Sequence, residues 1–77
     1  MTIQELETIN KKFNEEYDFL YQNYDRVAGF DEAVAFFDNG GVPSEILREL
    51  SNYRHDLIVS DRECGALVFA LNSLGYI

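Results

Sequence analysis

Cysteine, histidine and basic residues are scarce in this chain, and each scarcity argues against a class of function. A single cysteine rules out an internal disulfide framework and a zinc site built from four thiolates. Only 6 lysine and arginine residues stand against 14 acidic residues, which gives a formal net charge of −8. Nucleic-acid binders contact phosphates with clustered lysine and arginine, so this balance argues against direct nucleic-acid binding and against docking on an anionic membrane.

Long apolar runs and a secretion signal are also missing. No run approaches the roughly 18 apolar residues that a membrane-spanning helix needs, and residues 1–10 show no signal-peptide pattern. Apolar residues nevertheless make up 47% of the 77 residues, enough for a modest core. We therefore expect a single helical domain over residues 1–77, in a protein that is reduced and cytoplasmic.

The first predicted element is a long amphipathic helix over about residues 2–27. Thr2 and Glu5 form a T-x-x-E capping box, which marks a helix start. Apolar or aromatic residues then recur in steps of three and four, the spacing of one helix face. On the opposite face Lys11 can pair weakly with Glu15, and beyond Glu15 that face has no positive partner. The apolar stripe consists of Leu6, Ile9, Phe13, Tyr17, Leu20, Tyr24 and Val27.

The next two predicted helices are shorter. We expect Asp31 to cap a helix that runs through Phe37, and Asn39-Gly40-Gly41 to provide its exit. The third helix opens at Pro43-Ser44-Glu45, because proline is tolerated in a first turn and acid is favoured there. Leu57-Ile58-Val59 either continue this helix or form a short extended exit.

The fourth predicted helix is apolar on most sides. Ser60 and Glu63 form a second capping box, and Gly75 ends the helix. No charged residue lies between positions 64 and 71. A helix of this kind is usually surrounded by others, or it also meets a partner chain, so we expect it at the centre of the core. Its central leucines are then Leu67, Leu71 and Leu74.

These elements predict an all-α fold, a small four-helix domain with one long N-terminal amphipathic helix and three shorter helices. Three short helices cannot cover a helix of about 25 residues, which is roughly 37 Å long at 1.5 Å per residue. We therefore expect the first helix either to project beyond the bundle or to be covered by a second copy of the chain. So small a domain is only marginally stable alone, which also favours self-association.

Residues that catalyse reactions or bind metals are few. His55 and Cys64 are the only histidine and cysteine, and they lie on different predicted helices. We expect Cys64 to pack as a small hydrophobic residue, because it lies on an apolar face. Adjacent acids such as Glu15-Glu16 point about 100° apart, and Gly40-Gly41 lacks the lysine of a phosphate-binding loop. We predict no catalytic residue, no metal site and no cofactor.

Acidic residues are concentrated in the first half of the chain. Nine of the 14 lie within residues 1–38, against three basic residues, so that half carries a net charge of −6. Phe19 falls almost directly opposite the apolar stripe and lies among these carboxylates, and Phe36 likewise falls off the inner face of its helix. An aromatic ring with a charged rim is typical of an interface anchor. The predicted partner-binding residues are Glu15, Asp18, Phe19, Gln22 and Asp25.

This pattern favours a non-enzymatic protein that binds a protein partner with a basic surface and inhibits or modulates it. Carboxylates of such a protein can occupy the positions on a basic partner that bind phosphates, and the opposite charges steer the association of the two proteins. Phage-encoded inhibitors of nucleases or host-defence complexes, such as anti-CRISPR and anti-restriction proteins, share this size and charge, and so do toxin-immunity proteins. The analogy is with these general classes of protein and rests on no shared motif. The alternative is a helical homodimeric structural or regulatory adaptor, in which the fourth and first helices form the subunit interface and the charge serves only solubility.

Overall fold

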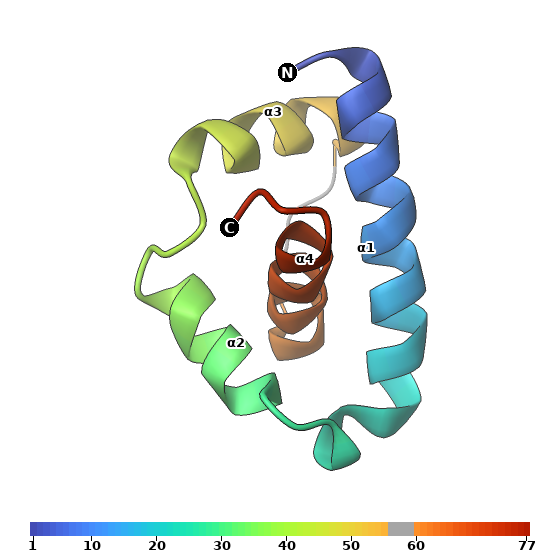
Figure 1. Cartoon of the computed structure of the whole chain (residues 1–77), viewed down its shortest axis with the longest axis vertical. Helices are drawn as coiled ribbons and strands as arrows, with labels where there is room; N and C mark the ends of the chain where they lie inside the picture. Colours follow the sequence, from blue (N-terminus) through green and yellow to red (C-terminus); the bar gives the residue numbers. More distant parts are fainter. Residues whose placement is uncertain (56–59) are drawn as a thin grey trace.

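Four α-helices make up most of the described part of the chain (Figure 1). The computed structural model describes residues 1–55 and 60–77. The helices are α1 (Ile3–Asn23), α2 (Phe30–Asp38), α3 (Ser44–Arg54) and α4 (Asp61–Ser73), and a 3-10 helix, η1 (Tyr24–Arg26), follows α1. These residues contain no strand, so the predicted all-α class is confirmed. None of the described helices has the length and apolar character needed to cross a bilayer.

Helix α1 begins at the predicted capping box. The Glu5 backbone N–H donates to Thr2 Oγ1 at 3.1 Å, and the Thr2 N–H donates to Glu5 Oε1 at 2.9 Å. These bonds satisfy two amides that a helix start leaves unpaired, and the Thr2 N–H holds the pKa of Glu5 below its usual value. The α-helix ends at Asn23, earlier than predicted, and the chain tightens into η1 before it becomes extended at Val27.

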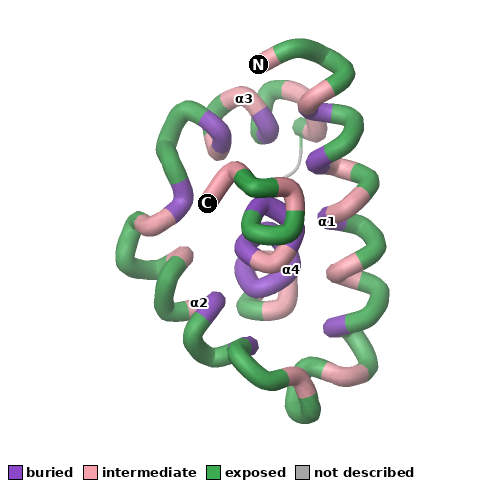
Figure 2. The backbone as a smooth tube through the Cα atoms, in the orientation of Figure 1, coloured by how far each residue is buried: buried purple, intermediate pink, exposed green. Residues whose placement is uncertain are grey.

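Helix α4 occupies the centre of the fold, with α1 on one side and α2 on the other (Figure 1). Figure 2 shows that burial is concentrated on this helix and on the faces turned toward it. Leu67 and Leu71 are fully enclosed, as predicted, and Leu74 is half-buried just after the helix ends. Packing against helices on two sides explains why α4 is apolar on most of its circumference. Its buried residues are Cys64, Gly65, Ala66, Leu67, Val68, Ala70 and Leu71.

Phe30 joins α2 to this central helix. A Cβ atom at Gly65 would lie 2.9 Å from the Phe30 ring, closer than real side chains approach, so the glycine provides the space for the ring. Gly29 precedes α2 in a left-handed conformation with φ of 86°, which glycine adopts without strain. The helix therefore starts at Phe30, and Asp31 lies inside its first turn. The prediction that Asp31 caps α2 was wrong, because the turn at Gly29 starts the helix earlier.

The apolar stripe of α1 is buried along most of its length. Its buried residues are Leu6, Ile9, Phe13 and Leu20, and Tyr17 and Val27 are half-buried. Tyr24 was predicted on the same stripe but is 40% exposed. It is the first residue of η1, where the tighter 3-10 geometry changes the direction of successive side chains. The stripe therefore ends with the α-helix.

One chain covers this stripe, which corrects the expectation that α1 projects or needs a second copy. The 21 residues of α1 span about 32 Å at 1.5 Å per residue, and the long axis of the molecule measures 34 Å. Helix α3 lies near the amino-terminal end of α1, where the Met1 amine contacts Glu49 Oε1 at 2.7 Å, and α4 lies further along (Figure 1). The prediction failed because α1 is shorter than expected and its neighbours are spread along it.

The remaining boundaries follow the local sequence signals. Helix α2 exits through Asn39-Gly40-Gly41, and α3 follows directly after Pro43. At the start of α4, Ser60 Oγ accepts from the Glu63 N–H at 3.1 Å, and the Ser60 hydroxyl donates to Glu63 Oε1 at 2.9 Å. The choice between a helical and an extended Leu57-Ile58-Val59 lies outside the described residues.

Candidate functional site

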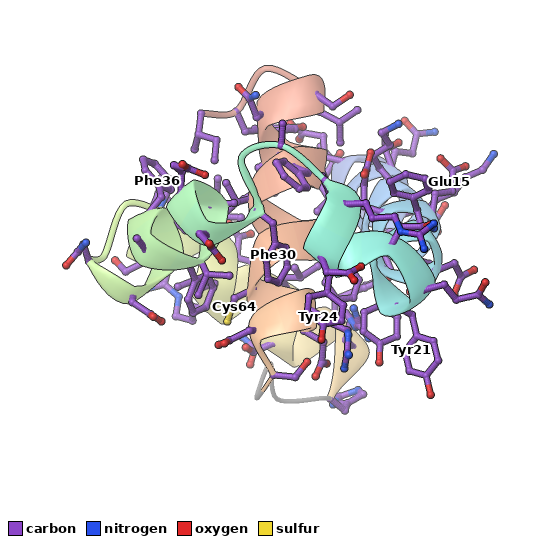
Figure 3. The ribbon with its side chains drawn as sticks, turned by 90° about the horizontal axis from the view of Figure 1, so that it is seen from below. Glu15, Tyr21, Tyr24, Phe30, Phe36 and Cys64 are labelled. Atoms are coloured by element: carbon purple, nitrogen blue, oxygen red, sulfur yellow. The ribbon has the colours of Figure 1, made fainter. Side chains whose placement is uncertain are left out.

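Four of the five predicted partner-binding residues lie together on the solvent side of α1. Glu15, Asp18, Phe19 and Gln22 are all exposed, and their spacing places them on one helix face. Phe19 is 53% exposed, as its position opposite the apolar stripe predicted. Figure 3 shows Glu15 on the side of the molecule away from α2. These four residues form the outer face of α1.

Asp25, the fifth predicted residue, belongs to η1 and not to α1. It is exposed, as predicted, but it lines a groove together with residues of α2 and α4. The α-helix has ended before Asp25, so the helical spacing that groups the other four residues does not apply to it. The structure therefore places Asp25 in a groove that is separate from the four residues on the outer face of α1.

The outer face of α1 keeps most of its negative charge. Lys12 Nζ lies 3.9 Å from Glu15 Oε2 and 3.5 Å from Glu16 Oε1, so Glu15 pairs with Lys12 and not with the predicted Lys11. Exposed pairs of this kind contribute about 0–1 kcal/mol. Within residues 1–55 and 60–77, no lysine or arginine nitrogen lies within 4 Å of the Asp18 carboxylate. The face is therefore open to a cation from another molecule.

A groove of about 560 Å³ opens where the end of α1 meets the amino ends of α2 and α4. Tyr24, Val27 and Phe30 supply its apolar lining, and the ring centroids of Tyr24 and Phe30 are 5.6 Å apart (Figure 3). The positive ends of helix dipoles favour carboxylates at helix starts, which accounts for acids on α2 and α4 here. The four acidic residues of this acidic groove are Asp25, Asp31, Glu32 and Asp61. Sequence reasoning missed the groove, because its carboxylates come from three separate elements.

Arg62 stacks on two tyrosines beside the acidic groove. Its guanidinium carbon lies 4.2 Å from the Tyr24 ring centroid and 5.6 Å from the Tyr21 ring centroid. The attraction between a cation and an aromatic face ties the start of α4 to the end of α1. The Arg62 Nε–H is buried and donates to no acceptor among the described residues, so the rings are the main contact of this side chain. Tyrosines and arginine lie far apart in the chain, and no local pattern connects them.

Cys64 is only 7% exposed, which confirms that it packs as a small hydrophobic residue. Burial raises the pKa of its thiol, and the negative charges of Asp38, Asp61 and Glu63 raise it further. A protonated thiol is a poor nucleophile. His55 is exposed and ends α3 with a left-handed backbone at φ of 64°.

The carboxylates form an extended charged surface. Across residues 1–55 and 60–77, no group of three or more histidine, cysteine, aspartate or glutamate side chains could hold a metal ion. The acids therefore surround the groove and line α1 without converging on one point.

An apolar hollow of about 240 Å³ lies between α2 and the end of α4. It is lined by Phe36, Val68, Asn72 and Ile77, and Phe36 is 40% exposed, in agreement with its predicted position off the inner face. Figure 3 shows Phe36 on the opposite side of the molecule from Glu15, so the apolar hollow is separate from the acidic surface. Comparisons with protein-family models, with curated proteins and with solved structures found no match for this chain.

Proposed function

We propose that this protein is a non-enzymatic binding protein that docks on a macromolecule with a basic surface and inhibits or modulates it. A nuclease or a host-defence complex is the kind of partner proposed, in the manner of phage-encoded inhibitors or toxin-immunity proteins. Carboxylates on the outer face of α1 would take positions that phosphates occupy on the partner. A single cysteine that stays a thiol fits a cytoplasmic location.

The observation that supports the proposal most is an exposed aromatic ring among carboxylates. Phe19 is 53% exposed and belongs neither to the buried core nor to the side chains packed against it. Asp18 precedes it, and Glu15 and Gln22 lie about one helical turn to either side. The fold gains little from this ring, whereas an interface would bury it and use the surrounding charges to steer association.

The test begins with a pull-down from native host lysate, in which the recovered partner is eluted by a salt gradient. Salt screens exposed charges over about 10 Å at 0.1 M, so electrostatic docking should weaken steeply as salt rises. The recovered partner is then titrated with the Glu15→Lys, Asp18→Lys double variant. We expect a loss of several kcal/mol in binding, because like charges then face the basic surface. Stability should change by under about 0.5 kcal/mol per substitution, because both residues are exposed.

The Asp38→Lys, Glu45→Lys double variant is the matched control. It makes the same change in net charge on α2 and α3, away from the outer face of α1 (Figure 1). Lysine is favoured at the carboxyl end of α2 and disfavoured at the start of α3, so the two effects on stability oppose each other. If both double variants weaken binding equally, only net charge matters and the outer face is not the docking surface.

Phe19→Ala tests the proposed anchor separately from the charges. We expect a faster dissociation rate and a loss of about 2 kcal/mol or more, because interface aromatics carry much of the binding energy. Phe36→Ala is its control, since Phe36 is also exposed but lies on α2. An unchanged dissociation rate for Phe19→Ala would show that the ring is not part of the interface.

A helical homodimeric adaptor is the second candidate, and the apolar hollow is the observation that favours it. The interface first expected for such a dimer, on α4 and α1, is largely occupied within one chain, because α1 and α2 enclose α4. A dimer would instead use the hollow beside Phe36. Sedimentation at several concentrations and salt levels distinguishes the candidates: a dimer that resists salt and is lost in Phe36→Ala would favour the adaptor.

A further inference from the structure

The acidic groove differs from the outer face of α1 because it is a concavity with an aromatic lining. The rings of Tyr24 and Phe30 are tilted by 57° with their centroids 5.6 Å apart. The groove volume of about 560 Å³ lies in the range of ligand-binding sites, roughly 300–1,000 Å³. Among the described residues that line it there is no lysine or arginine, so its negative charge is not neutralised from within.

The distribution of charge in the groove selects a cation with several hydrogen-bond donors. Asp25 comes from η1, Asp31 and Glu32 from the first turn of α2, and Asp61 from the first turn of α4. In the ranges 1–55 and 60–77, no three acidic side chains approach closely enough to hold a metal ion. A guanidinium presents five N–H donors in one plane and can therefore serve carboxylates that lie on different sides of it.

Arg62 provides an example of a guanidinium on Tyr24, one of the two aromatic residues that line the groove. Tyr24, Phe30 and Asp61 line both the acidic groove and a neighbouring hollow that contains Arg62. The Arg62 guanidinium carbon lies 4.2 Å from the Tyr24 ring centroid, and no carboxylate oxygen of the described residues lies within 4 Å of its nitrogens. Ring stacking, which arginine makes more readily than lysine, is therefore a contact that this wall already makes.

We propose that the acidic groove receives an arginine side chain of the basic partner. The guanidinium would lie against the Tyr24 side chain, which is 40% exposed, and face the carboxylates of Asp25, Asp31 and Asp61. Phe30, only 8% exposed, would support the Tyr24 ring from the interior. This inference rests on the proposed function, since it takes the partner to be a basic protein, and it adds a subsite that distinguishes arginine from lysine. Helix dipoles explain why acids lie at the starts of α2 and α4, but not why they line one groove together with Asp25 and Tyr24.

The test is a titration of the full isotope-labelled chain with three capped hexapeptides, in which glycine alternates with arginine, lysine or serine. We expect the arginine peptide to shift the amide signals of Asp25, Phe30, Asp31 and Asp61. It should bind at least about threefold more tightly than the lysine peptide, because a guanidinium stacks better than an ammonium on the Tyr24 ring. The serine peptide should cause no shift at these residues.

Asp31→Asn and Glu45→Gln form a matched pair, because each residue is exposed and is the second residue of a helix. We expect Asp31→Asn to weaken binding of the arginine peptide about threefold and Glu45→Gln to leave it unchanged. Tyr24→Leu should bring the arginine and lysine peptides to equal affinity. Its amide spectrum reports whether the fold is kept, and Asp31→Asn tests the same groove without removing a ring.

Three results would overturn the arginine site: no shift of the groove amides, equal affinity of the parent chain for the arginine and lysine peptides, or equal weakening by Asp31→Asn and Glu45→Gln. Titration of the recovered partner separates this inference from the proposed function. If the outer-face double variant weakens partner binding and Asp31→Asn does not, the function stands and the arginine site falls. If the arginine peptide binds in the groove but the outer-face variant binds the partner like the parent, the outer face of α1 is not the docking surface and that part of the proposed function falls.

Discussion

Leu71→Ala is expected to remove a large part of the stability of this fold. Leu71 is 0% exposed and lies on α4, the helix between α1 and α2 (Figure 1). The substitution deletes about three methylene equivalents at ~0.8 kcal/mol each, so the transfer loss alone is about 2.4 kcal/mol. A cavity adds to this loss because helices on both sides hinder collapse, which gives about 3–5 kcal/mol in total. At ~0.05–0.15 kcal/mol per residue, the whole domain has about 4–12 kcal/mol.

Thermal and urea unfolding followed by circular dichroism measure this loss. A change of 1 kcal/mol shifts the Tm of a domain of this size by about 4–8 °C, so we expect a fall of at least about 12 °C, or a chain unfolded at room temperature. Leu74→Ala is the matched control, because it makes the same deletion at a half-buried position just beyond the helix. Its Tm should fall clearly less. A Leu71→Ala melting curve that matches the parent, or equal losses in both variants, would refute the central position of α4.

Two further predictions concern the same helix. Gly65→Ala gains up to about 1 kcal/mol of helix propensity but places a Cβ 2.9 Å from the Phe30 ring, an overlap that costs about 1–3 kcal/mol. Urea unfolding should therefore show a net loss of stability. A variant more stable than the parent would contradict the packing of α2 on α4. Cys64 should react slowly with a thiol reagent in the native protein and fast in denaturant, because the side chain is buried. Because its thiol pKa is raised, the labelling rate of the native protein should increase only above the usual thiol pKa. Rapid labelling at neutral pH would be inconsistent with this, and Cys64→Ala should leave partner binding unchanged.

The helix boundaries could be predicted wherever the signal lies within a few residues. The capping box at Thr2 and the hydroxyl cap at Ser60 are local hydrogen-bond patterns, and both form at the predicted positions. Asp31 was assigned the wrong role because a left-handed glycine at position 29 starts the helix first. An acid near a helix start is favoured by the dipole both as a cap and inside the first turn, so the sequence does not distinguish the two.

The residues of the candidate site likewise include some whose positions a local sequence pattern predicts and one whose position it does not. The exposure of Asp18 and Phe19 follows from helical periodicity, because a residue opposite a buried stripe faces solvent. Asp25 was grouped with them by extending that period past the end of the α-helix. Its position in the acidic groove depends on where α2 and α4 begin in space. The spacing of residues within 2–27 holds no information about those positions.

By itself the sequence determined the all-α class, the apolar stripe of α1 and the apolar character of α4, because periodicity and capping act over one or two turns. Only the tertiary structure decided that one chain covers α1, that Arg62 stacks on Tyr24, and that acids from three elements line one groove. These features depend on the angle and distance between helices, which are set by packing between residues far apart in the chain, such as Phe30 against the space left by Gly65.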